Sequence, residues 1–329
     1  MTRSGFCIDE KPTAVAFPDP RAASVEYLRS VDTQYFEYVA NACRVLLQDD
    51  DRSNQHRAAQ LLRQNMFQAV EATISLTFAV LQAPDNIPGW LSRYKLHHLR
   101  SLSEKVKHGR PFPVRVFLAN YQWSGISEAI MENARFGSLE IERQTIGTFV
   151  KFLAWSADLV ASDAWSEYNA MKHGVRVFPG GFVLRMGIER IPGQAAATEA
   201  LRTIMSSEFG TTYPIAREVD RPQKGLVIGR ASVGWRPDEV ARQLVLASQL
   251  IHNLVLFARL YLRDEVGTEV AFVRPTDLRT FTGSSSAEPQ IRFFPNETDG
   301  QSSEEAIWST YAWPLSWSPH SASVIPGTA

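Results

Sequence analysis

The stretch AWSEYNAMKHGVRVFPGGF, residues 164–182, marks the point at which the pattern of the chain changes. Before it, apolar residues recur at steps of three and four, which is typical of amphipathic helices. After Lys172, apolar and polar residues alternate on both sides of Pro-Gly-Gly, which predicts a β-hairpin. The sequence therefore predicts a helical body that ends near residue 173 and is followed by a β element.

Turn residues divide the part of the chain before this stretch into helices. The clearest break is APDNIPGW, residues 83–90, because two prolines and a glycine stop a helix. The predicted helices cover approximately residues 24–47, 54–82, 91–107, 123–135 and 139–172.

The part after this stretch returns to helix and then loses its periodicity. GLVIGRASVGW, residues 225–235, predicts a strand, and a long apolar helix is predicted over residues 239–262. We expect a mainly α fold, an antiparallel helical bundle with a small β-hairpin or sheet annex and a disordered C-terminal tail. The predicted divisions are a loose N-terminal arm (1–20), the bundle (21–173), the β-hairpin annex plus a long helix packed on the bundle (174–275), and a Ser/Pro-rich, mostly irregular tail (276–329).

Composition excludes several classes of protein. Lys and Arg number 34 against 35 Asp and Glu, so the chain lacks the strong positive charge of a dedicated nucleic-acid binder. Cys7 and Cys43 are too few for a disulfide scaffold or a thiolate metal site. No signal peptide or uninterrupted apolar run of about 18 residues predicts export or a membrane span, so we expect a cytoplasmic protein. Without a glycine-rich phosphate loop, a Gly-x-Ser-x-Gly elbow or a His-Glu-x-x-His motif, we expect no cofactor and no metal.

The tripeptide Lys-His-Gly occurs twice, and its first copy, residues 107–109, is typical of a helix end. Cations in a last turn complement the helix dipole, and glycine adopts the left-handed conformation that follows. The surrounding stretch 93–115 contains seven Lys or Arg and one acid, Glu104. This basic stretch either binds an anionic partner or is a solvated face balanced by acids elsewhere. In the first case the binding residues include Lys107, His108 and Arg110.

The second copy, residues 172–174, has more polar chemistry around it. A helix that continues to Lys172 places Asn169 and His173 one turn apart on one face, with Trp165 a further turn before them. An amide and an imidazole side by side over an aromatic ring can bind a phosphate or position a proton transfer. Arg176, just past the glycine, supplies a fixed positive charge.

The segment YNAMKH, residues 168–173, resembles the Arg-Asn-x-x-x-His motif of HEPN domains, which are small all-helical modules. Asn169 and His173 match the motif, whereas Tyr168 stands in the position of its Arg. The resemblance implies a helical module over residues 24–173 and an RNA partner. In that family the His and Arg cleave RNA without a metal, commonly across a homodimer interface. Many members act in bacterial defence or in toxin–antitoxin pairs.

Tyr168 leaves alternatives open for what the protein does. Arg176 or Lys172 takes over the role of the missing Arg in a metal-independent endoribonuclease, or the protein is an inactive relative that binds RNA. The other class is a non-enzymatic module that uses the basic stretch to bind a protein partner such as an antitoxin, or a second copy of the chain.

Two further polar features interrupt apolar helices. Glu71 is the only charged residue in MFQAVEATISLTFAVL, residues 66–81, so it requires a partner or a proton when buried. Its candidate partners are His173, His108 and Arg100, in a structural pair or as a catalytic acid or base. The second feature is a polar spot at Gln249, His252 and Asn253, which predicts either a core hydrogen-bond network or a helix that lines the same cleft as His173. A further option is a small-molecule site between Glu71 and this spot.

Overall fold

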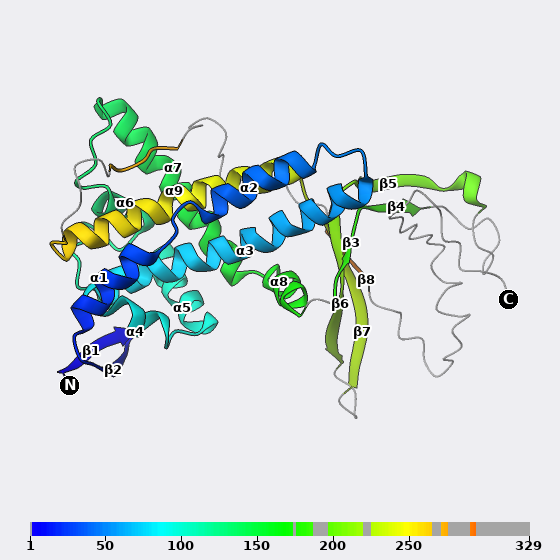
Figure 1. Cartoon of the computed structure of the whole chain (residues 1–329). Helices are drawn as coiled ribbons and strands as arrows, with labels where there is room; N and C mark the ends of the chain where they lie inside the picture. The colour runs from blue at the N-terminus through cyan, green and yellow to red at the C-terminus, as the bar shows by residue number, and fades with distance from the viewer. Residues whose placement is uncertain are drawn as a thin grey trace. The chain divides into compact units, whose positions relative to one another are not determined.

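The computed structural model describes residues 2–173, 176–186, 197–219, 225–264, 271–275 and 290–293 (Figure 1). Helices dominate these residues and the sheets are small and antiparallel, so the predicted mainly α fold class is confirmed. The chain divides into two compact units. Unit 1 comprises residues 1–42, 65–165 and 241–285, and unit 2 comprises residues 43–64, 166–240 and 286–329.

The N-terminus forms a β-hairpin, so the prediction of a loose arm over residues 1–20 was wrong. β1 (Thr2–Ile8) pairs antiparallel with β2 (Lys11–Phe17). Asp9 closes the turn with a positive φ of 58°, which Asp tolerates better than most residues. Phe6 and Ile8, two positions apart on one face of β1, are buried. The prolines of β2 and of the following segment hid this short alternation in the sequence.

Local turns divide two of the predicted helices. The predicted helix 24–47 is α1 (Pro20–Ser30) and α2 (Tyr35–Leu46), because the Asp32 carboxylate accepts the Gln34 N–H and forms a turn. The predicted helix 139–172 is α7 (Leu139–Ala161) and α8 (Trp165–Lys172). There Ser162 has extended backbone, and its hydroxyl accepts the Ala164 N–H.

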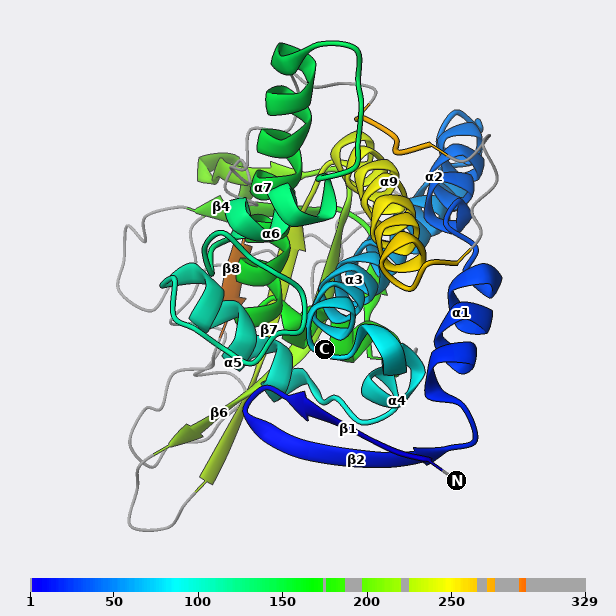
Figure 2. The ribbon, with the colours of Figure 1, turned by 90° about the vertical axis from the view of Figure 1, so that its left-hand side faces the viewer.

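The remaining helices of unit 1 follow the predicted order. α3 (Arg52–Gln82) begins in unit 2 and enters unit 1 at Asn65. The proline-rich break after it forms the short helices η1 (Pro84–Asn86) and α4 (Ile87–Leu91), and α5 follows at Leu96–Lys107. α5 and α6 (Trp123–Ile130) both pack against α7 (Figure 2).

The long helix α9 (Pro237–Tyr261) belongs to unit 1 from Ala241 onward, as expected for a helix packed on the bundle. It runs antiparallel to α1 and α2, because the Glu37 N–H donates to Ser248 Oγ and Thr33 contacts His252. By length and composition, α9 and the bent pair α3–α4 could each cross a membrane. In α9, however, 72% of the apolar window is buried inside the structure, as a core helix requires.

The described residues of unit 2 form two antiparallel sheets. The first has the order β3 (Phe178–Pro179), β6 (Gly210–Val219), β7 (Gly225–Gly234) and β8 (Gln290–Phe293), and the second pairs β4 (Phe182–Met186) with β5 (Arg202–Ser207). A short helix, η2 (Thr198–Ala200), precedes β5. The strand predicted at residues 225–235 is confirmed as β7. β8 is a strand inside the predicted irregular tail 276–329, and the rest of that tail lies outside the described residues.

The predicted hairpin across Pro-Gly-Gly was wrong, because its two arms pair with different strands. β3 pairs with β6, and β4 pairs with β5. The Gly180 N–H donates to the Gly210 carbonyl at 3.1 Å, and a Cβ at Gly181 would collide with the Ser207 carbonyl. The two glycines therefore permit a close backbone crossing from one sheet to the next.

Candidate functional site

α8 has one buried and one exposed face, and the predicted motif lies across both. The buried residues follow the helical spacing of one side of α8, and His173 follows the last helical residue, Lys172. Asn169 and His173 are both exposed, in agreement with their predicted common face. The buried residues are Trp165, Glu167, Tyr168, Ala170 and Met171, and the exposed residues are Ser166, Asn169, Lys172 and His173. Arg176, the next described residue of the predicted site, is also exposed.

The aromatic ring beside these polar groups is Tyr168. The prediction placed Trp165 on the face of Asn169 and His173, but Trp165 is buried and packs edge-on against Phe67. The ammonium of Lys172 instead lies 4.6 Å from the centroid of the Tyr168 ring, within the range of a cation–π contact. Tyr168 is only 2% exposed, so its ring supports Lys172 from inside the protein.

A fully buried ion pair fixes the inner face of α8. Arg63 of α3 donates from Nε to Glu167 Oε1 at 3.2 Å and from Nη2 to Oε2 at 2.8 Å. The side chains of Arg63 and Glu167 are 1% and 0% exposed. The bidentate geometry is the strong form of this pair, and burial makes each partner dependent on the other.

The strands of unit 2 complete this buried network. Thr211 of β6 donates its hydroxyl to Glu167 Oε1, and the indole N–H of Trp235 donates to Thr211 Oγ1 at 3.3 Å. The guanidinium of Arg63 also lies over the Trp235 ring, 5.8 Å from its centroid. The carboxylate of Glu167 thereby connects three elements: α3, α8 and the end of the β6–β7 hairpin.

The sequence analysis did not single out Arg63 or Glu167. The available signal was a charged residue within an apolar helical frame, the same signal that pointed to Glu71. Arg63 follows Leu62 and is one turn away from Ala59 and Phe67, which are buried. Which acid would pair with it depends on the long-range pairing of α3 with α8, which a local pattern does not contain.

Glu71 is half-buried in unit 1 and accepts a hydrogen bond from the Tyr94 hydroxyl at 3.2 Å. Burial, followed by the charge of Glu71, raises the pKa of Tyr94 to about 12. Of the predicted partners, Arg100 donates to the Val160 carbonyl and His108 contacts Glu104. His173 belongs to unit 2, so a joint catalytic role of Glu71 and His173 stays a prediction.

The first Lys-His-Gly is confirmed as a helix end. Gly109 has a φ of 63°, its N–H donates to the Val106 carbonyl, and the Arg110 N–H donates to the Lys105 carbonyl, which together form a Schellman motif. Among the described residues, three of the seven cations of the basic stretch are paired with acids, so the second of the two interpretations holds for these three. Its ion pairs are Lys105 with Asp9 and Glu10, Lys107 with Asp158 at 2.8 Å, and Arg115 with Asp85 at 2.6 Å. Arg110 is exposed.

Two residues of the polar spot of α9, His252 and Asn253, form a structural network, whereas the buried Gln249 Oε1 has no hydrogen-bond partner among the described residues. Asn253 donates to and accepts from the backbone of Val273 at 2.8 Å, and His252 contacts the Ala271 carbonyl at 3.0 Å. These side chains hold the segment 271–273 against α9. This use of both residues replaces their predicted role as a wall of a small-molecule site.

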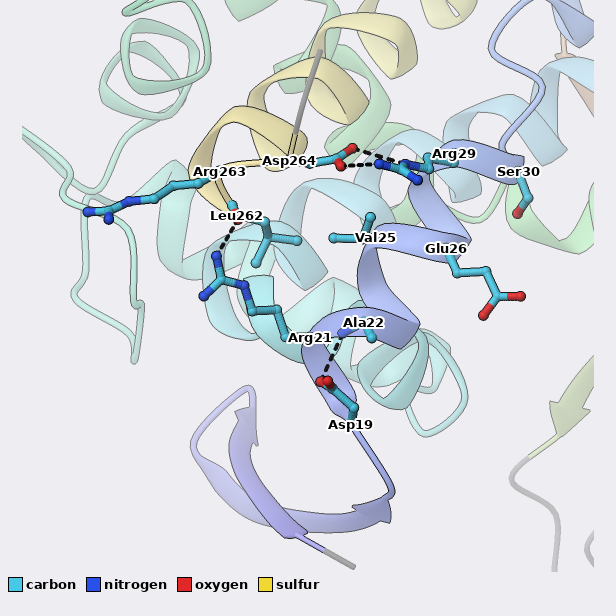
Figure 3. A pocket seen from close by; sticks show the side chains of 10 residues that line it. All are labelled: Asp19, Arg21, Ala22, Val25, Glu26, Arg29, Ser30, Leu262, Arg263 and Asp264. Atoms are coloured by element: carbon cyan, nitrogen blue, oxygen red, sulfur yellow. Dashed lines mark hydrogen bonds and ion pairs between the residues drawn. The ribbon is translucent and has the colours of Figure 1, made fainter.

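A shallow groove of about 690 Å³ lies between α1 and the end of α9, and paired charges line it (Figure 3). Arg21 donates to the Leu262 carbonyl, and Arg29 and Arg259 both bind the Asp264 carboxylate. Hydrogen bonds from Arg29, and then from Arg259, lower the pKa of Asp264 below its usual value. Cations at this position satisfy the end of α9, so we assign these residues a structural role.

The described residues contain no group of three or more His, Cys, Asp or Glu that could hold a metal ion. Comparisons with models of protein families, with curated proteins and with solved structures found no match for this chain. The functional argument therefore rests on the side chains of α8 and on what lies beneath them.

Proposed function

We propose that the protein is a HEPN-like RNA-binding protein that holds single-stranded RNA on the α8 surface without cutting it. The α8 surface consists of Asn169, Lys172, His173 and Arg176. The observation that supports this proposal is that all four side chains are exposed, while Tyr168 at the Arg position of the motif is buried.

The chemistry of the α8 surface suits a phosphodiester. Lys172 and Arg176 supply positive charge, and the amide of Asn169 and the ring of His173 supply hydrogen-bond donors. The Arg63–Glu167 pair beneath α8 holds the helix in place, which reduces the ordering that binding requires. The surface has few charges, so we expect moderate affinity and a modest dependence on salt, set by about two phosphate contacts.

The same geometry disfavours cleavage. In-line attack on a phosphodiester needs a cation beside the developing charge, in a fixed position relative to the general acid or base. Tyr168 is a buried phenol, so the position of the motif's Arg supplies no such charge. Lys172 and Arg176, which bind phosphate in this proposal, lie outside that position. The protein therefore resembles the inactive binding relative among the alternatives. By the same resemblance, we propose that it works as a homodimer in a bacterial defence or toxin–antitoxin context.

Binding can be tested with a short fluorescent single-stranded RNA at low salt. We expect the double variant Lys172→Ala/Arg176→Ala to weaken binding by about tenfold, because two phosphate contacts are lost. Lys151→Ala is the matched control, since Lys151 is an exposed lysine of α7 outside the α8 surface. Equal affinities of wild type and the double variant would contradict the proposal.

Cleavage is tested separately by incubating mixed RNA with the protein in EDTA. We expect intact RNA with the wild type and with His173→Ala. Metal-independent cleavage by the wild type that His173→Ala abolishes would overturn the non-cleaving assignment. In that case the endoribonuclease alternative would apply to the same surface.

A further inference from the structure

The strongest unassigned feature is a pocket of about 320 Å³ between α5, α6 and α7, all within unit 1. Its lining is mostly apolar and includes Val106, Trp123, Val150 and the alanines 154, 157 and 161 of α7. Small residues on the α7 side leave a flat surface that accepts a ring. The volume is at the low end of the roughly 300–1,000 Å³ typical of small-molecule sites, so a compact ligand fits it and a folded segment does not.

A buried hydroxyl without a partner lies in the wall of this pocket. Ser103 of α5 is 3% exposed, and its Oγ has no hydrogen-bond partner among the described residues. A buried hydroxyl usually makes a hydrogen bond, and leaving it unpaired costs free energy. A ligand hydroxyl that reaches Ser103 would make the missing bond.

The charges at the mouth favour a cation. Glu104 and Asp158 line the pocket together with one cation, Lys107, and both carboxylates are more than half exposed. Lys107 pairs with Asp158 at 2.8 Å, so two acids against one lysine leave one negative charge in excess at the mouth. His108 outside the lining contacts Glu104. The mouth also lies at the C-terminal ends of α5 and α7, where the helix dipoles are negative.

The N-terminus of α6 does not offset this preference. Its first residues line the pocket, and a free helix N-terminus would attract an anion. Here the Asn120 side-chain oxygen already accepts the N–H groups of Gln122 at 2.9 Å and Gly125 at 3.3 Å.

We propose that this pocket binds a compact arylalkylamine, with its ring on the alanine surface, its ammonium near Asp158 and Glu104, and a ring hydroxyl at Ser103. Tyramine has all three features. Phenethylamine lacks the hydroxyl, p-hydroxyphenylacetate replaces the ammonium by a carboxylate, and p-cresol has no charge.

The test is calorimetric titration of the full-length protein with these probes. We expect tyramine to bind, and p-hydroxyphenylacetate to bind at least about tenfold more weakly, since its charge is reversed. Ser103→Ala should weaken the binding of tyramine roughly threefold to tenfold and leave the affinity for phenethylamine unchanged. Asp158→Asn should weaken the binding of both amines and leave the affinity for p-cresol unchanged. Ala154→Leu should abolish binding of all probes, because it fills the pocket.

Two control variants match these changes. Ser156→Ala removes another buried hydroxyl without a described partner, and Glu140→Gln removes another exposed acid of α7. Neither residue lines the pocket, so both variants should bind tyramine as the wild type does. Thermal unfolding shows that each variant is folded. Absence of tyramine binding at millimolar concentration, equal binding of p-hydroxyphenylacetate, or wild-type affinity in folded Ala154→Leu would each overturn the proposal.

Discussion

Glu167 is the residue on which the position of α8 depends most. It is fully buried and is bound by Arg63 and Thr211. Removal of one partner from a buried ion pair leaves an uncompensated charge, which costs more than the pair itself contributes. The α8 surface therefore depends on two residues that do not touch solvent.

We predict that Glu167→Gln lowers the free energy of unfolding by about 3–5 kcal/mol, because Arg63 then stays charged and buried. Urea denaturation followed by circular dichroism measures this loss. Arg63→Met combined with Glu167→Leu should recover most of it, since the charges are removed together. Arg52→Gln is the control, because Arg52 and Glu208 form an exposed pair for which we expect a loss of less than about 1 kcal/mol. A similar, small loss in Glu167→Gln and Arg52→Gln would show that the buried pair does not stabilise unit 2.

Asp264 gives a prediction on pH. The hydrogen bonds from Arg29 and Arg259 lower its pKa in the folded state, so its stabilising effect is fully present above the unfolded pKa of about 3.9. The effect is lost as the pH falls through the lower, folded-state pKa. The difference in unfolding free energy between wild type and Asp264→Asn should therefore shrink below about pH 3.9. Urea denaturation of both proteins across this range measures it, and a constant difference would contradict the assignment.

Single residues also show what a sequence pattern can and cannot predict. The exposed face of Asn169 and His173 follows from helical spacing alone, and the structure has both side chains exposed. The burial of Glu167 and Tyr168, two positions that the same spacing places on the opposite face, depends on what packs there. Arg63 and Thr211, the partners of Glu167, are distant from it in sequence, so no local pattern identifies them.

Among the elements, the ends of α5 and α9 form the same motif with different residues. Both have the two Schellman hydrogen bonds, but the left-handed position is Gly109 in α5 and Arg263, with a φ of 52°, in α9. A side chain in this conformation is strained, whereas glycine adopts it freely.

We predict that Arg263→Gly stabilises the protein and that Gly109→Ala destabilises it, each by about 1 kcal/mol. The nearest atom to a Cβ at Gly109 would be 3.4 Å away, on the flexible Gln122 side chain, so the cost comes from the backbone. Thermal unfolding of the two variants measures both effects. Destabilisation by Arg263→Gly would mean that the exposed arginine side chain contributes more than its backbone costs.

The elements that were predicted well are those with long periodic patterns, such as α3 and α9. The wrong predictions concern short-range turn chemistry and long-range pairing. The Asp32 and Ser162 turns interrupt patterns that otherwise continue, so single helices were expected where two exist. At Pro-Gly-Gly, the two strands that are neighbours in sequence, β3 and β4, were expected to pair with each other. In the structure β3 pairs with β6 and β4 pairs with β5.

For the whole molecule, charge is balanced in total. The formal net charge is −1, and within the described residues three of the seven cations of the basic stretch 93–115 are paired with acids, namely Lys105, Lys107 and Arg115. Any attraction to RNA therefore has to come from a small group of exposed cations and cannot come from a general positive field. Within the described residues of unit 2, Lys172 and Arg176 are exposed and lie close in sequence to the exposed Asn169 and His173, and we propose that they act as such a group.

The central claim, that the α8 surface contacts RNA phosphates, is tested most directly by the salt dependence of binding. The logarithm of the affinity for single-stranded RNA falls with the logarithm of salt concentration by about 0.7 for each phosphate contact. We expect Lys172→Ala/Arg176→Ala to reduce this slope by about 1.4 and Lys151→Ala to leave it unchanged. An equal slope in the wild type and the double variant would show that the α8 surface does not contact RNA phosphates.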